Sequence, residues 1–402
     1  MNESSGTRQS EGEERVRRLQ DALKDAQLDA ILTTLPSYVL MVSGYWPVLG
    51  TAMAIATAEG EVAVLAPEDE LRFAEHSWAH RVRTFKPARL DAITTAAIEA
   101  AQPLRALLRD LEVHCARIGY ELGAASEPST YAGMNLYAHS VVDVLREAAP
   151  SAPLAPADQL LRRLAAVKTP AEVARIRLSC RIAGQSFDFG VSQVRAGARE
   201  TEVAAAYRAG LSVYGMTNET VRRADGFAWC MSGPNSALAK GAFAHSTSRK
   251  LQEGDLVLVH ANSYADGYWT DITRTQVLGT ADDKQRKIYA TITEARAAAF
   301  AAIKPGVHAS EVDRAAREVL TKHGFGDYFP HPTGHGVGFA AISANAHPRI
   351  HPRSDEVLET GMTFNIEPAV YIDDWGGARH CDMVAVTGSG MELLTGFQPV
   401  AG

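Results

Sequence analysis

Hydrophobic positions in the first part of the chain follow helical and strand-like periods in turn. Between residues 14 and 27, apolar side chains return at helical spacing, which predicts an amphipathic helix. The short, dense apolar run after it is typical of a buried strand. The same pattern predicts helices over 14–27 and 90–111 and strands over 28–35, 52–57, 61–66 and 113–119. These elements form a small α/β domain, and the polar residues 1–13 before it predict a disordered tail.

A segment rich in Ala, Ser and Pro at 151–164 separates this domain from the rest of the chain. Thr169, Pro170 and Glu172 then predict a helix start, with Thr as the N-cap, Pro in the first turn and Glu three residues after the cap. The elements predicted beyond the separator are helices over 170–193, 201–214, 282–302 and 309–323 and strands over 226–231 and 255–262, followed mainly by strands and turns. The expected organisation is a 1–13 tail, an N-terminal domain over 14–160 and a second domain over 161–402. Helices packed on one face of a curved sheet predict the α+β class for the second domain.

Composition narrows the functional classes. The 402 residues are 46% hydrophobic and 22% charged, as in a soluble globular protein of two domains. No apolar run approaches the roughly 18 residues of a membrane helix, and the polar N-terminus lacks the apolar core of a signal peptide. A net charge of -7 without a basic block argues against nucleic-acid binding. Four scattered cysteines without CxxC spacing predict a reduced, cytoplasmic protein.

Five side chains that can bind a metal or transfer a proton lie in or beside strand-like runs of the second domain. They are His260, Asp271, His335, Glu367 and Cys381. Each has an apolar flank, and polar groups buried among apolar strands must be paired or must coordinate a metal. The sequence therefore predicts one buried polar site on a sheet.

The motifs around these residues resemble the aminopeptidase P/prolidase/creatinase superfamily of pita-bread hydrolases. The resemblance is carried by VKTPAEVARIR at 167–177, SGPNSA at 232–237, DITRT at 271–275, GHGVG at 334–338, GMTFNIEPAVY at 361–371 and GGARHCD at 376–382. It covers the chain from about residue 14 to its end. It implies a pita-bread catalytic domain preceded by a small α/β creatinase-type domain, and it implies a homodimer.

In metal-dependent members, the resemblance implies five ligands, of which four are carboxylates, around two divalent ions. Asp271, His335 and Glu367 occupy three of these positions. His260 stands where the first Asp is expected, and Cys381 stands where the last Glu is expected. Loss of two carboxylates predicts loss of the second metal. Mixed nitrogen, oxygen and sulfur ligands favour one zinc or iron ion over manganese.

The superfamily also places two catalytic histidines outside the ligand set. The aligned positions here hold Lys240 and Ile342, and the nearest histidines are His245 and His347. We expect His245, His347 or His260 to transfer protons. Three further residues are expected to support the ligands, namely Arg274, Arg379 and Asp382.

Three functions remain open at this level. The first is hydrolysis of a C–N bond in an amide, dipeptide-like or amidine-like substrate, with water activated at one metal ion. The second is a metal-free, creatinase-like hydrolase or lyase in which histidine acts as acid and base. The third is a non-catalytic binding module for a peptide or protein that has kept the fold.

Overall fold

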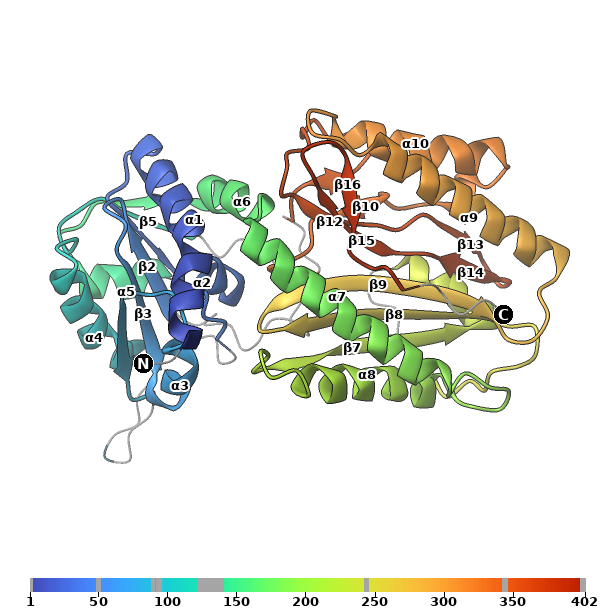
Figure 1. Ribbon diagram of the computed structural model, residues 1–402, viewed down its shortest axis with the longest axis horizontal. Coiled ribbons are helices and arrows are strands. Elements are labelled where there is room, and N and C mark those ends of the chain that lie inside the picture. The colour runs from blue at the N-terminus through green and yellow to red at the C-terminus, as the bar shows by residue number, and fades with distance from the viewer. Residues whose placement is uncertain are drawn as a thin grey trace. The chain divides into compact units, whose positions relative to one another are not determined.

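The computed structural model describes residues 3–47, 52–87, 91, 96–121, 141–241, 246–341 and 346–397 (Figure 1). The chain forms two compact units that divide between Ala165 and Ala166, where the sequence predicted a division after residue 160. Among the described residues, no helix combines the length and the apolar character that a bilayer span requires.

The first unit is a six-stranded mixed sheet with helices. Its strands lie in the order β4-β3-β2-β1-β5-β6. The strands are β1 (Ala30–Thr33), β2 (Met53–Thr57), β3 (Val62–Pro67), β4 (Arg81–Phe85), β5 (Ile118–Tyr120) and β6 (Leu154–Pro156). The helices are α1 (Glu3–Asp25), α2 (Pro36–Ser43), α3 (Leu71–Ala74), α4 (Ala96–Asp110), α5 (Val141–Ala148) and α6 (Asp158–Ala166), of which the last reaches the division. The α/β character predicted for this part of the chain is present.

Several elements of this unit differ from the local predictions, and α1 and β4 illustrate why. Helix α1 begins at Glu3, so residues from Glu3 onward extend the helix that was expected to start at residue 14. Arg, Gln and Glu are good helix formers and can prolong a helix that an amphipathic segment has already nucleated. Strand β4 was not predicted, because its Arg81–Phe85 sequence is mostly polar and only Phe85 is buried.

The second unit contains the antiparallel sheet on which the candidate site is built. Strands β7 (Ala224–Ser232), β8 (Leu256–Ala265) and β9 (Tyr268–Val277) follow one another in the sheet. A tight turn joins β8 to β9, and Asp266 adopts a positive φ of 50° there beside Gly267. The long pairing of β8 with β9 fixes which side chains share a face.

Shorter strands from the C-terminal part complete the second unit. They are β10 (Gly334–His335), β11 (Arg349–Ile350), β12 (Thr363–Ile366), β13 (Ala369–Ile372), β14 (Gly376–Arg379), β15 (Asp382–Val386) and β16 (Met391–Leu393). They form the arrangements β12-β15-β16, β13-β14 and β10-β11. Single antiparallel bridges at Thr273–Cys381 and Gly336–Phe364 connect these short sheets to one another and to β9.

Two helix pairs cover the second unit (Figure 1). Helices α7 (Pro170–Val191) and α8 (Glu200–Met216) pack together and contact the β7–β9 sheet. Helices α9 (Asp283–Ala302) and α10 (Ala309–Lys322) pack together, and their apolar faces share one core with β12, β13 and β15. Helix α7 starts at the predicted capping box, in which Thr169 and Glu172 each accept a backbone N–H from the other.

Candidate functional site

The β8–β9 pairing supplies the first half of the site. His260 lies opposite Thr273, and Asn262 lies opposite Asp271. Because side chains two residues apart in a strand point to the same face, these four side chains form one polar patch. All four are buried. Asp271 and Thr273 are two residues apart in the sequence, so both side chains lie on the face of the site.

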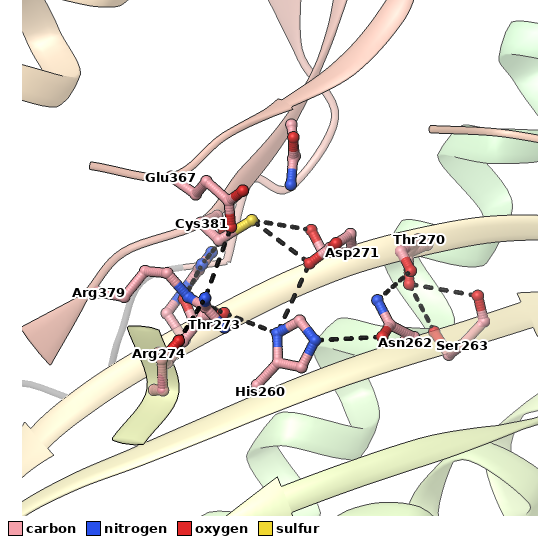
Figure 2. Close-up of polar contacts among 12 residues, drawn as sticks. His260, Asn262, Ser263, Thr270, Asp271, Thr273, Arg274, Glu367, Arg379 and Cys381 are labelled. Atoms are coloured by element: carbon pink, nitrogen blue, oxygen red, sulfur yellow. Dashed lines mark hydrogen bonds and ion pairs between the residues drawn. The ribbon is translucent and has the colours of Figure 1, made fainter. Parts of the chain in front are cut away.

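The C-terminal strands bring the remaining candidate ligands to this patch. The backbone of Cys381 exchanges hydrogen bonds with that of Thr273, at N–O distances of 3.1 and 3.4 Å. This bridge places the Cys381 sulfur 3.6 Å from a carboxylate oxygen of Asp271 (Figure 2). Asp271, Glu367 and Cys381 each offer one ligand atom, and these three atoms lie within 4.8 Å of one another.

His335 joins this cluster from β10. Its Nε2 atom lies 3.5 Å from Asp271 Oδ2 and 4.0 Å from Glu367 Oε1. Its Nδ1 atom lies 3.1 Å from the Gly336 carbonyl oxygen, so Nδ1 carries a hydrogen and Nε2 is directed at the carboxylates. The side chain of Asn365 accepts the backbone N–H of His335 at 2.7 Å and holds this strand in place.

The glycines on either side of His335 allow the close packing of this segment. A Cβ atom on Gly334 would lie 1.9 Å from the carbonyl oxygen of Asn365. A Cβ atom on Gly336 would lie 2.1 Å from the carbonyl oxygen of His347. The GHG sequence is therefore required sterically, because only glycine lets the backbone approach this closely.

His260 lies beside the cluster, with its Nδ1 atom 3.6 Å from Asp271 Oδ1, and both of its ring nitrogens make hydrogen bonds. Its Nε2 atom lies 3.1 Å from Asn262 Oδ1, and its Nδ1 atom lies 2.9 Å from the Thr273 hydroxyl. Thr273 in turn accepts a hydrogen bond from Arg379 Nε at 3.0 Å, so its hydroxyl can donate to His260. Burial lowers the pKa of His260 to about 4 despite the nearby Asp271 carboxylate, so its imidazole is neutral near pH 7.

The buried ionisable groups of the site shift one another's pKa values. Burial raises the pKa of Glu367 to about 7, against the opposing effect of Arg379, whose guanidinium lies 3.7 Å away. Burial also acts on Asp271, but the neighbouring histidines and Arg379 outweigh it and lower its pKa to about 2. The pKa of His335 rises to about 9, because Asp271 and Glu367 overcome the effect of burial. Without a metal, a proton on His335 balances the carboxylate charge.

The donor set fits a divalent metal ion. Two carboxylates, an imidazole nitrogen and a thiol converge on one buried location, and each is a recognised metal ligand. Burial and the neighbouring carboxylates raise the pKa of Cys381 well above its usual value, so metal binding there must displace the thiol proton. Both ring nitrogens of His260 make hydrogen bonds, so metal binding by His260 must displace one of them.

The predicted supporting residues hold the ligand-bearing strands. Arg274 donates to the carbonyl oxygen of Cys381 at 2.7 Å and to Asp382 Oδ1 at 2.7 Å. Asp382 is fully buried and also pairs with Arg296. Arg379 reaches Glu367 directly, whereas Arg274 and Asp382 act on the backbone beside Cys381.

The predicted catalytic histidines have different placements. His245 lies outside the described residues. His347 is half-buried, and its Nδ1 atom lies 2.9 Å from a carboxylate oxygen of Glu356. Its backbone lies beside Gly336, the residue after His335. Its described polar contact is therefore directed at Glu356, not at Asp271 or Glu367.

Sequence reasoning missed five residues of the site. They are Asn262, Thr273, His331, Asn365 and Tyr371. The Nε2 atom of His331 lies 3.1 Å from the Tyr371 hydroxyl, which also lies 3.3 Å from Arg379 Nη1. Strand alternation could have revealed three of them, because Asn262 and Thr273 are two residues after His260 and Asp271, and Asn365 is two residues before Glu367.

Comparison with known proteins places this geometry in a family. Residues 174–388 match metallopeptidase family M24, and residues 15–167 match the creatinase/prolidase N-terminal domain. An Xaa-Pro dipeptidase of Pyrococcus horikoshii is 27% identical over 388 residues, which are 95% of this chain and 97% of that protein. An Xaa-Pro dipeptidase of Pyrococcus furiosus is 36% identical over 238 residues, which are 59% of this chain and 65% of that protein.

Solved structures agree with the sequence relatives. The prolidase of Pyrococcus horikoshii superposes with a TM-score of 0.76 at 26% identity, over 97% of this chain and 100% of that one. The prolidase of Pyrococcus furiosus gives a TM-score of 0.73 at 29% identity, over 94% of this chain and 99% of that one. The predicted superfamily, the pita-bread fold with its creatinase-type N-terminal domain, and the enzyme class of C–N hydrolases are confirmed. The chain belongs to metallopeptidase family M24.

Proposed function

We propose that this protein hydrolyses the C–N bond of dipeptide-like substrates of the Xaa-Pro type, with one divalent metal ion at the site. The relatives named Xaa-Pro dipeptidase support the substrate class. From the family resemblance we further infer a homodimer, and from the four scattered cysteines a reduced, cytoplasmic protein.

The observation that carries this proposal is the convergence of Asp271, Glu367 and Cys381. Their ligand atoms lie within 4.8 Å of one another, and His335 Nε2 lies 3.5 Å from Asp271. We assign Asp271, His335 and Glu367 as metal ligands and Cys381 as a fourth. A divalent ion bound there supplies Lewis acidity, which lowers the pKa of water and polarises the scissile carbonyl.

The protein's own residues provide the remaining chemistry. Burial raises the pKa of Glu367 to about 7 in the metal-free protein, so metal binding there must displace the proton of its carboxyl group. Arg379 lies 3.7 Å from Glu367 and is fixed by its hydrogen bond to Thr273, so it orients that carboxylate. His347 and His245 remain our candidates for a second proton-transfer group.

The number of metals follows from charge and geometry. This chain has two carboxylates, Asp271 and Glu367, where the family resemblance implies four. A neutral His260, hydrogen-bonded through both ring nitrogens, does not offset a second dication. We therefore infer one ion. The sulfur and nitrogen ligands favour zinc or iron over manganese.

A second candidate is a metal-free hydrolase of the creatinase type. It is favoured by the position of His335, because a protonated imidazole beside Asp271 and Glu367 already balances the buried negative charge. In that case Asp271 and Glu367 orient a cationic substrate and His335 or His260 transfers the proton.

Metal content of protein purified without chelators or a histidine tag separates these functions. About one zinc or iron per chain, together with cleavage of an Xaa-Pro dipeptide, supports the proposal. In Asp271→Asn, we expect loss of the metal and of hydrolysis, whereas the exposed Asp283→Asn should retain both. About two metals per chain would contradict the single-ion assignment. No bound metal, even after metal is added back, would favour the metal-free mechanism.

A further inference from the structure

An aromatic row extends from the site along the edge strand β7. Trp229 lies opposite His260 in the β7–β8 pair, and Phe227 lies opposite Asn262. The rings of Trp229 and His260 are stacked, with centroids 5.5 Å apart and an interplanar angle of 17°. Phe227 continues the row, with its centroid 6.1 Å from that of Trp229 and an angle of 16°.

These rings lie on the face of the sheet that carries the candidate ligands. Strand alternation places Phe227 and Trp229 on one face of β7 and small residues on the other. On the opposite face, a Cβ atom on Gly226 would lie 2.7 Å from Leu211 of α8, and a Cβ atom on Gly215 of α8 would lie 2.1 Å from Ala224. The close approach of α8 therefore requires small residues on its side, and the large rings occupy the face of the site.

The aromatic row begins next to the candidate metal ligands. His260 Nδ1 lies 3.6 Å from Asp271 Oδ1, so Trp229 is separated from the ligand cluster by one imidazole ring. Phe227 and Trp229 are both half-buried. Beyond Phe227, the guanidinium of Arg208 lies 5.5 Å from its ring centroid and pairs with Asp225 at 3.6 Å. The apolar surface is thus bounded by the site at one end and by charge at the other.

Because the rings of Phe227, Trp229 and His260 are stacked face to face, their edges point away from the stack. Ring edges carry partial positive charge and attract the face of a further aromatic ring. We propose that Trp229 and Phe227 form a specificity wall that selects substrates with an aromatic side chain next to the scissile amide. This inference rests on the proposed dipeptidase function and names the side chain that the site prefers.

The test compares Phe-Pro with Ala-Pro on the metal-loaded protein. One aromatic contact gives up to about a tenfold effect, so kcat/KM for Phe-Pro should exceed that for Ala-Pro by about tenfold, mainly through KM. Trp229→Ile should bring the two substrates to within about twofold, Trp229→Phe should restore part of the preference, and Phe227→Ala should reduce it. The matched control is Trp375→Ile, since Trp375 is also half-buried but lies at the turn between β13 and β14.

A binding measurement separates failure of this inference from failure of the proposed function. Calorimetric titration of Phe-Pro and Ala-Pro reports preference without turnover. If Phe-Pro is not hydrolysed but still binds more tightly than Ala-Pro in a Trp229-dependent way, the dipeptidase function is wrong. The proposed role of Trp229 and Phe227 in selecting an aromatic side chain is then retained. Equal affinities in the wild type, or a preference that is unchanged in Trp229→Ile, would contradict the proposed role of Trp229 and Phe227 in substrate selection. Circular dichroism of each variant checks that a lost preference does not reflect unfolding.

Discussion

The Nδ1 atom of His260 lies 2.9 Å from the hydroxyl oxygen of Thr273, its partner across the β8–β9 pair. This contact belongs to a directed series in which Arg379 donates to Thr273, Thr273 donates to His260, and His260 donates to Asn262. The series satisfies both nitrogens of a neutral imidazole. It explains how this chain keeps a buried histidine where a carboxylate is expected, without leaving an unpaired charge.

Restoring the two missing carboxylates should restore the second metal. In His260→Asp/Cys381→Glu, four carboxylates face one another, and their repulsion is relieved by two dications. We expect metal content to rise from about one to about two ions per chain, measured by elemental analysis after equilibration with manganese.

The control for this double variant is His114→Asp, which adds a carboxylate at an exposed position of the first unit. It should leave the metal content unchanged. A double variant that folds but still holds about one ion would show that the altered ligand set does not limit the metal number.

Cys381 should give a spectroscopic signature. If its sulfur binds the metal, cobalt-substituted protein will show a thiolate-to-cobalt charge-transfer band in the near ultraviolet, and Cys381→Ser will lose it. Metal affinity should also fall, by at least about tenfold. Cys115→Ser, which changes an exposed thiol, is the matched control. A band that persists in Cys381→Ser would exclude Cys381 as a ligand.

The metal-free protein should lose stability as pH rises. Asp271 and Glu367 raise the folded-state pKa of His335 from 6.5 to about 9, against the effect of burial. The resulting stabilisation is complete below about pH 6.5 and disappears as pH rises through about 9. Urea unfolding of metal-stripped protein should show a decrease on the order of 2 kcal/mol across this range.

His335→Gln should flatten this pH dependence, because the titrating group is removed. Bound metal should flatten it as well, since the ion replaces the proton between the same side chains. An equally steep decline in metal-stripped His335→Gln would assign the pH dependence to another group.

Asp382 should contribute more to the free energy of unfolding than any exposed ion pair does. Its buried carboxylate accepts hydrogen bonds from Arg274 at 2.7 Å and Thr395 at 2.6 Å and pairs with Arg296. Burial opposes ionisation of Asp382, but these cations and His380 hold its pKa below the ordinary value. Asp382→Asn leaves two arginines without their counter-charge and should reduce the free energy of unfolding by about 3 kcal/mol.

The comparison for Asp382 is Asp373→Asn. Asp373 pairs with Lys240 at the surface, where solvent screens the interaction. Its loss should change the free energy of unfolding by less than about 1 kcal/mol in the same chemical denaturation experiment. Equal effects of the two substitutions would contradict the structural role assigned to Asp382.

The sequence by itself determined the local elements and the chemical types at the site. The Thr169–Glu172 capping box predicted the start of α7, and the strand-like runs around the candidate residues predicted one buried polar site on a sheet. The family resemblance of the motifs implied that Asp271, His335 and Glu367 form one ligand set. The helix start and the strand-like runs depend on neighbours within a few residues, whose geometry is encoded locally.

Only the tertiary structure decided how the separate segments meet. The bridge between Thr273 and Cys381 sets the distance from the sulfur to Asp271, and the hydrogen bonds of His260 to Thr273 and Asn262 fix its ring beside Asp271. The same packing places His331 against Tyr371. Sequence spacing contains no distance between residues far apart in the chain. Such distances depend on strand register, side-chain rotamer and competition among hydrogen-bond partners, and these are settled only when the sheets pack together.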